Sequence, residues 1–194
     1  MKSFFLRKSS FFQKIFFIFY FLLSLVFLIY ISLPSPQFPN PPEDAIQSFE
    51  PGDSEDLASR RAYFSNYKRE EVINHYRDQF SINLLGKKIF PMRLNYPPED
   101  SQTLIRDQTR TTYLEELVFP FRESFFVNGN ESGDSDSLIF IDGNFWWQKV
   151  TVRYYRSLPH IRILIGLFSI VVLWFVLNYW FMILGSVVKF LKRK

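Results

Sequence analysis

The chain is 194 residues long, which is enough for one folded domain with accessory segments. It contains no Cys, and this excludes disulfides, thiolate zinc sites and thiol catalysis. The net charge is +4, but all 19 acidic residues lie between Glu43 and Asp142, where residues 34–160 hold only 14 basic ones. The basic excess therefore belongs to the two ends of the chain and does not indicate a nucleic-acid partner.

The first predicted element is a membrane-spanning helix over residues 15–33, which follows a basic N-terminus over residues 1–14. The run has 19 uncharged residues, 15 of them Ile, Leu, Val or Phe. As a helix it is about 28 Å long, close to the thickness of the hydrocarbon core. A buried helix of a soluble core and a cleavable signal peptide are the alternatives. An uncleaved anchor is favoured, because the run is longer than a signal peptide's apolar segment and no A-x-A pattern follows it.

The orientation of this helix follows from its flanking charges. Four basic residues precede the run, and none follows it until Arg60. Positively charged flanks stay on the cytoplasmic side, so the N-terminus is predicted to be cytoplasmic.

Residues 34–59 have a different composition, with six Pro, six acidic residues and no Lys or Arg. They are predicted to form a Pro-rich acidic spacer, semi-rigid and polyproline-like, with little that could build a core. Removal of residues 39–53 is therefore predicted to leave the stability of the following domain unchanged. A docking peptide for a basic partner is the alternative interpretation.

Residues 60–160 are predicted to form an extracytoplasmic domain. Residues 60–66 suit a strand, and Asn66 suits the N-cap of a helix within residues 68–80. The apolar residues of that helix recur at helical spacing and mark a core-facing stripe. They are Val72, Ile73, Tyr76 and Phe80. The stretch 63–80 resembles the strand–helix opening of small extracytoplasmic domains of bacterial lipoproteins and membrane-anchored envelope proteins. The likeness covers under a tenth of the chain and assigns no site residue.

A second helix is predicted over residues 98–119, with Pro98 at its first position and Pro120 closing it. Residues 81–86, between the two helices, are expected to form a turn. Residues 87–96 are expected to form an edge strand, because Pro91 cannot donate a ladder hydrogen bond. The apolar side of the second helix is predicted to comprise Leu104, Ile105, Tyr113, Leu114, Leu117 and Val118.

The rest of the domain is predicted to be β-rich. Short strands are expected at residues 123–129 and 137–141, and Asp142-Gly143-Asn144 is a strong hairpin signal. A strand follows at 145–155, with alternate residues on one face: Trp146, Val150, Val152 and Tyr154. The predicted fold class is α+β, a small antiparallel or mixed sheet with two helices on one face, flanked by two transmembrane helices. The helix stripe and the strand face are expected to meet in one core.

A second membrane-spanning helix is predicted over residues 161–188, with a cytoplasmic basic tail over 189–194. Asn178 lies deep in this apolar run, where water is absent, so its amide is predicted to face another helix. Trp174 lies nearer the middle of the run than an interfacial Trp normally does. These two residues are predicted to mark a helix–helix packing side, with the first helix of the same chain favoured over a foreign subunit.

His75 is the first candidate for chemistry. Glu71 precedes it by four residues and Asp78 follows it by three, so the three side chains can share a helix face as a metal or general-base cluster. An exposed helical His among charges is the favoured interpretation. Glu115 and Glu116 are adjacent, so their side chains would diverge on a helix and would not form a catalytic pair.

The loop 128–139 offers Asn and Asp oxygens, with Gly133 at the sixth position of a calcium-loop pattern. Ile139 stands where that pattern needs a bidentate Glu, which favours a plain polar turn. We predict no catalytic residue, no cofactor and no metal site.

The favoured function is that of a two-pass plasma-membrane protein with both termini cytoplasmic. Its partners are predicted to be the lipid bilayer and another membrane protein, and its role to be non-catalytic binding or structure in a membrane or envelope complex. One alternative is an accessory or sensory subunit of a transporter or receptor. A cell-surface hydrolase is the other.

Overall fold

The structure, a computed structural model, describes residues 11–50, 53, 56, 58–84, 86–97, 112–131 and 138–191. The chain divides into two compact units. The first comprises Met1–Pro34 and Leu158–Lys194, and we call it the helix pair. The second is Ser35–Ser157, and we call it the sheet domain.

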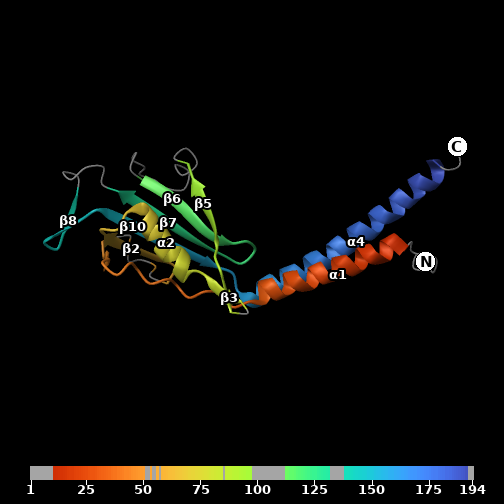
Figure 1. Cartoon of the computed structure of the whole chain (residues 1–194), viewed down its shortest axis with the longest axis horizontal. Helices are drawn as coiled ribbons and strands as arrows, with labels where there is room; N and C mark the ends of the chain where they lie inside the picture. The colour runs from red at the N-terminus through yellow and green to blue at the C-terminus, as the bar shows by residue number, and fades with distance from the viewer. Residues whose placement is uncertain are drawn as a thin grey trace. The chain divides into compact units, whose positions relative to one another are not determined.

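The helix pair consists of α1 (Phe11–Ser32) and α4 (Pro159–Leu191) (Figure 1). Both helices are long and apolar enough to cross a membrane. In their most apolar windows only 6% of α1 and 11% of α4 is buried. Burial in a protein core therefore does not account for their composition, and the predicted core-helix alternative for α1 has no support.

The sheet domain is built on a six-stranded antiparallel sheet in the order β1-β2-β10-β7-β6-β5 (Figure 1). Its strands are β1 (Ile46–Gln47), β2 (Arg60–Ser65), β5 (Met92–Tyr96), β6 (Thr112–Phe119), β7 (Glu123–Glu131) and β10 (Gln148–Arg156). Two hairpins form separate two-stranded sheets: β3 (Ile82–Leu84) with β4 (Lys87–Ile89), and β8 (Ile139–Ile141) with β9 (Asn144–Trp146). The helix α2 (Arg69–Gln79) completes the described part of this unit. The α+β class and the antiparallel sheet are as predicted.

The core forms where the predicted helix stripe meets the sheet. All four stripe residues are 0% exposed, and they share one cluster with Val150 and Val152 of β10. The Phe125 ring of β7 lies 5.1 Å from the Tyr76 ring and 5.4 Å from the Phe80 ring. Both predicted sets of core residues are thus confirmed. Trp146, predicted on the same strand face, belongs instead to the separate hairpin strand β9.

The second predicted helix of the domain is wrong over residues 112–119, which form strand β6; residues 98–111 lie outside the described residues. β6 pairs with β5 on one side and β7 on the other. Residues on the core-facing side of β6 are buried, and so are Leu114 and Glu116 on its opposite face. A strand buried on both faces lacks the alternation that distinguishes a strand from a helix in sequence.

Two local predictions also fail. The N-cap of α2 is Lys68, whose backbone N–H donates to the Glu71 carboxylate at 2.7 Å, and not Asn66. The Asn66 side chain instead accepts a hydrogen bond from the Trp147 backbone at 3.0 Å. Residues 81–86 are more than a turn, because β3 begins at Ile82.

Described residues of the Pro-rich segment pack on the domain. The Phe38 ring lies 5.9 Å from Phe125 and 6.1 Å from Tyr154, and Pro36 O accepts from the Tyr154 hydroxyl at 2.7 Å. Ile46 of β1 pairs with Phe64 of β2. The composition predicted a spacer here. A few apolar side chains and the free backbone carbonyls of a proline-rich chain are sufficient to attach it to the sheet.

Candidate functional site

The most extensive polar network is the Glu115 cluster, formed by Glu115 with Arg69, Arg93 and Glu70. Glu115 projects from β6 and is 0% exposed. Its carboxylate accepts from Arg69 Nε at 2.7 Å and from Arg93 Nη2 at 2.8 Å. The Arg93 guanidinium also donates to both Glu70 oxygens, at 2.7 and 2.8 Å. Helix α2 and strands β5 and β6 are thereby joined by alternating charges.

Within the Glu115 cluster, Arg93 and Glu70 each favour the charged form of the other. Hydrogen bonds from Arg93 lower the pKa of Glu70, and hydrogen bonds to Glu70 and Glu115 raise the pKa of Arg93. Nearby, a hydrogen bond to Glu116 raises the pKa of Tyr96 to about 12. A general base needs a carboxylate that is accessible and ready to accept a proton. Glu115 is 0% exposed and both of its oxygens accept hydrogen bonds from arginine, so the geometry of this network supports the fold and offers no accessible base.

Glu115 and Glu116 diverge as predicted, although on a strand and not on a helix. Successive strand residues point to opposite faces of the sheet. Glu115 binds the two arginines, whereas Glu116 accepts from the Tyr96 hydroxyl. The two carboxylates therefore do not form a pair.

The alternative interpretation of His75, a cluster with Glu71 and Asp78, is not assembled in the structure. His75 Nε2 lies 3.0 Å from Asn40 O and 2.8 Å from Gln79 Nε2. Glu71 caps α2, and Asp78 pairs with Lys88 at 2.9 Å. Among the described residues, no three His, Cys, Asp or Glu are placed to hold a metal ion. Of the calcium-like loop, residues 132–137 lie outside the described residues.

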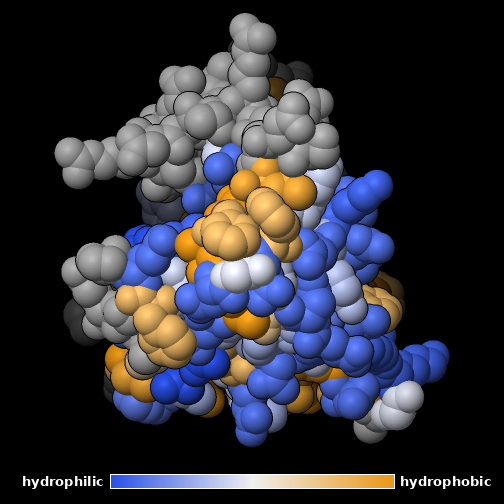
Figure 2. Space-filling view, turned by 90° about the vertical axis from the view of Figure 1, so that its left-hand side faces the viewer, coloured by the Kyte–Doolittle hydropathy of each residue, from blue (hydrophilic) through white to orange (hydrophobic). Residues whose placement is uncertain are grey.

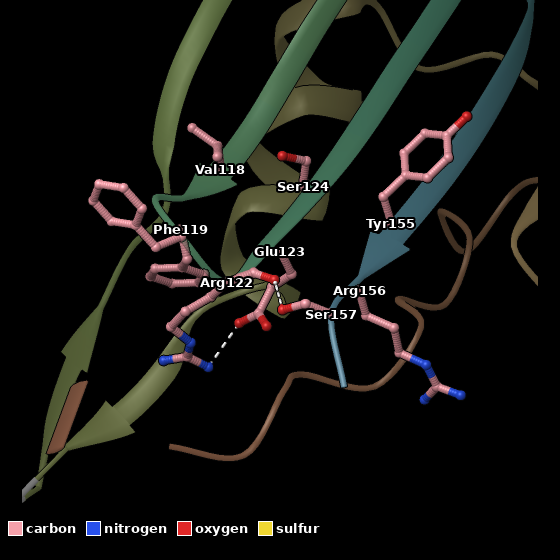
Figure 3. A pocket seen from close by; sticks show the side chains of 9 residues that line it. Val118, Phe119, Arg122, Glu123, Ser124, Tyr155, Arg156 and Ser157 are labelled. Atoms are coloured by element: carbon pink, nitrogen blue, oxygen red, sulfur yellow. Dashed lines mark hydrogen bonds and ion pairs between the residues drawn. The ribbon is translucent and has the colours of Figure 1, made fainter. Parts of the chain in front are cut away.

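A shallow pocket of about 370 Å³ lies beside the turn that joins β6 to β7 (Figure 3). Within it, Arg122 and Glu123 form an ion pair of 2.7 Å with both side chains 0% exposed. Tyr155 and Arg156 line it from the end of β10, and the Arg156 side chain extends away from the ion pair. The remaining lining residues are Val118, Phe119, Phe121, Ser124 and Ser157. We call this site the Phe121 pocket; its lining combines two arginines with aromatic rings, and its one carboxylate, that of Glu123, is paired with Arg122.

The β8–β9 hairpin carries an exposed aromatic pair. Phe140 and Phe145 are cross-strand neighbours with ring centroids 4.9 Å apart, and they are 59% and 62% exposed. The predicted Asp-Gly turn closes this hairpin, with φ of 51° at Asp142 and 80° at Gly143. Figure 2 faces the side of the domain that carries β8 and shows an apolar patch with hydrophilic residues around it. We call this surface the aromatic hairpin.

In the helix pair, the two predicted packing residues behave differently. The Trp174 ring lies 4.3 Å from Phe17 and 5.9 Å from Tyr20 of α1. Asn178 donates to Trp174 O at 2.8 Å within its own helix. Its packing against another helix stays a prediction. Arg162, which was not predicted to take part in the packing, is 5% exposed and donates to Ile31 O and Leu33 O at the end of α1.

Arg69, Arg93, Phe121 and Arg122 were also missed. No sequence signal exists for the first two, because only the folding of α2 and β5 around β6 brings them to Glu115. Pro120 between two apolar runs was the available signal for the turn beside the pocket, since Pro interrupts periodic segments. Comparisons with protein-family models, with curated proteins and with solved structures found no match.

Proposed function

We propose that this chain is a two-pass plasma-membrane protein that presents the sheet domain outside the cell and binds another membrane or envelope protein. Both termini are cytoplasmic in this arrangement. The two long apolar helices support the membrane part of the proposal. The basic residues before α1 and the basic cluster from Lys189 to the end support the orientation.

The aromatic hairpin carries the binding part of the proposal. A two-stranded hairpin gains little stability by itself, and its Phe140–Phe145 pair is largely exposed. Exposed aromatic clusters with a polar surround are typical of protein interfaces. Asp142 lies at the exposed tip, and the 19 acidic residues between Glu43 and Asp142 outnumber the 14 basic residues of segment 34–160. The partner surface is therefore apolar at its centre and basic at its rim.

The enzyme alternative receives no support from the described acidic residues. Glu115 and Glu116 are engaged by arginine and tyrosine, and the Glu123 carboxylate is paired with Arg122. The accessory-subunit alternative is supported by Asn178, whose amide oxygen takes part in no hydrogen bond among the described residues. An unused amide oxygen in a membrane helix suits a third helix from another protein.

Single cysteines test the topology, because the chain has none of its own. Lys87→Cys and Asn144→Cys, both at exposed positions, are expected to react with a membrane-impermeant thiol reagent in intact cells. Cys in place of Ser9 is expected to react only after permeabilisation. Ser48 is unsuitable for this test, because it is 2% exposed and bonded to Asp53 at 2.7 Å. Labelling at position 9 alone would invert the proposed topology.

Substitution of the hairpin tests the binding role. The full chain carrying Phe140→Ser and Phe145→Ser is purified from its native membranes in mild detergent, beside the wild type and a Phe49→Ser control. Phe49 is 72% exposed and lies outside the hairpin. A co-purifying protein is expected to be lost from the double variant and kept by the control. Retention of every co-purifying protein by the double variant contradicts the proposed binding surface.

A further inference from the structure

The β6–β7 turn combines a strained backbone with an exposed aromatic side chain. Arg122 N–H donates to Phe119 O at 3.0 Å, which closes a four-residue turn with Pro120 second and Phe121 third. Phe121 has a φ of 63°. A positive φ at the third position of a turn favours Gly or Asn, and a bulky residue there is a true outlier.

Burial does not account for a Phe at this position. The Phe121 side chain is 78% exposed, so it gains little from burial in the domain. Gly would adopt the same backbone conformation without strain. A residue that is disfavoured by the backbone and is largely exposed points to a role outside the fold.

The surroundings of Phe121 resemble those of an interfacial anchor. Tyr155 is 52% exposed, and the exposed Arg156 follows it at the end of β10. Both line the Phe121 pocket. Aromatic rings suit the headgroup level of a bilayer, and the Arg guanidinium matches a phosphate with paired hydrogen bonds.

The chain also limits how far this turn can lie from the apolar helices. Ser157 Oγ donates to Arg122 O at 2.6 Å, and Ser157 is two residues before Pro159, where α4 begins. Ser35 Oγ donates to Glu123 at 2.9 Å, and Ser35 is three residues after Ser32, where α1 ends. Two and three residues span at most about 7 and 11 Å. This bound holds for any orientation of the two units.

We propose that the Phe121 turn is a membrane contact, in which Phe121 inserts among the lipid headgroups and Arg156 binds a headgroup phosphate. The inference rests on the proposed function in one respect, that α1 and α4 span the bilayer. The headgroup layer extends about 5–8 Å beyond the hydrocarbon on each side. The spans of about 7 and 11 Å to the helix ends keep the Phe121 turn close enough to reach this layer. Anionic phospholipid strengthens the contact, because each basic residue near a charged bilayer surface adds about a fivefold preference.

The test places one nitroxide at a time on the full chain in nanodiscs of phosphatidylcholine, with or without phosphatidylglycerol. Single cysteines replace Phe121 in the β6–β7 turn, Phe140 in the hairpin or Phe175 in α4, which are 78%, 59% and 66% exposed. Frequent collisions of the nitroxide with dissolved oxygen indicate that it lies in lipid. Frequent collisions with a water-soluble nickel chelate indicate that it lies in solvent. We expect the nitroxide to lie in lipid at positions 121 and 175 and in solvent at position 140.

The outcomes separate the two proposals. Solvent at 121 with lipid at 175 overturns the membrane contact and leaves the proposed two-pass arrangement standing. Solvent at both positions overturns the two-pass arrangement and the contact with it. Phosphatidylglycerol is expected to raise the lipid-to-solvent ratio at 121, and Arg156→Gln to lower that gain about fivefold. Lys87→Gln, at an exposed position on β4, is the matched control and is expected to keep the gain.

A stability measurement checks the premise that Phe121 does not serve the fold. The thermal midpoint of full-length Phe121→Gly is expected to equal or exceed that of the wild type, because Gly accepts the positive φ. A lower midpoint would show that the Phe side chain supports the domain, and it would overturn the inference.

Discussion

The helix pair and the sheet domain both bury charged side chains, and Arg162 and Glu115 show that the two units compensate such charges by different means. Arg162 of α4 is 5% exposed and donates to backbone carbonyls at the end of α1. Glu115 of β6 is 0% exposed and is held by the side chains of Arg69 and Arg93. The charge of Arg162 is compensated by the partial negative charges of backbone carbonyls, and that of Glu115 by the full positive charges of two guanidinium groups.

The difference reflects what each unit leaves unpaired. The last carbonyls of a helix have no partner within the helix and carry a partial negative charge, so a single cation serves them. Backbone groups inside a sheet are already paired, so they cannot compensate a buried carboxylate. Glu115 therefore depends on side chains brought from two other elements, and its loss is expected to cost more than the loss of Arg162.

The largest expected effect is that of Glu115→Ala, which leaves Arg69 and Arg93 without their shared carboxylate. Removing one partner of a buried ion pair costs about 3–5 kcal/mol. Glu70→Ala is the matched control, because its side chain is 65% exposed, and it is expected to cost less than about 1 kcal/mol. Denaturant unfolding of a Ser35–Ser157 fragment measures both. Similar costs would show that burial of Glu115 does not set its contribution.

The corresponding change in the helix pair is Arg162→Leu. Hydrogen bonds to a charged group contribute about 1.5–3 kcal/mol, so the helices are expected to separate at a lower SDS fraction in mixed micelles. Energy transfer between dyes on cysteines at Phe19 and Leu173, which are 63% and 48% exposed, reports the separation. His160→Leu, at an exposed position in the first turn of α4, is the control. Equal midpoints for the two variants would show that Arg162 does not hold the pair.

A smaller effect is expected where the Pro-rich segment packs on the sheet domain. Phe38→Ala removes a ring that contacts Phe125 and Tyr154 and lies under the Arg61 guanidinium at 4.1 Å. Since Phe38 is only partly buried, we expect a loss of about 1–2 kcal/mol. Phe49→Ala, in the same segment but 72% exposed, is expected to stay within about 0.5 kcal/mol. Equal small losses in thermal unfolding would restore the spacer interpretation.

The smallest effect is the pH dependence of the exposed edge of the Glu115 cluster. Arg93 lowers the pKa of Glu70 below 4.5, so this carboxylate contributes stability above pH 4.5 and loses it as the pH falls through the folded-state pKa. Glu70→Gln is expected to flatten this dependence below pH 4.5. Because Glu70 is largely exposed, the change should stay below about 1 kcal/mol. Parallel curves for the two proteins would exclude a contribution from this pair.

Local patterns in the chain were enough to predict several elements. The uncharged runs at 15–33 and 163–188 correspond to α1 and α4, because a helix pairs its own backbone whatever surrounds it. The stripe on α2 was visible because its apolar residues recur at helical spacing. Asp142-Gly143 gave the hairpin between β8 and β9, since both residues adopt the positive φ that this turn requires.

The same turn chemistry shows where local reasoning stops. Gly143 has the positive φ that its residue type favours, whereas Phe121 has one that its residue type disfavours. The strands on either side impose that conformation, together with the bond from Arg122 N–H to Phe119 O. Preference alone would have placed Gly at 121, so the exposed Phe became evident only in the folded domain.

By itself the sequence determined the two apolar helices, the amphipathic α2 and the Asp-Gly hairpin, because each depends on residues that are neighbours along the chain. The tertiary structure alone decided that residues 112–119 are a strand, that Phe38 joins the core, and that Glu115 is buried between two arginines. Those outcomes depend on partners that are distant in sequence. Glu115 of β6 and Arg69 of α2 are 46 positions apart, and only the packing of α2 against the sheet brings them within hydrogen-bond distance.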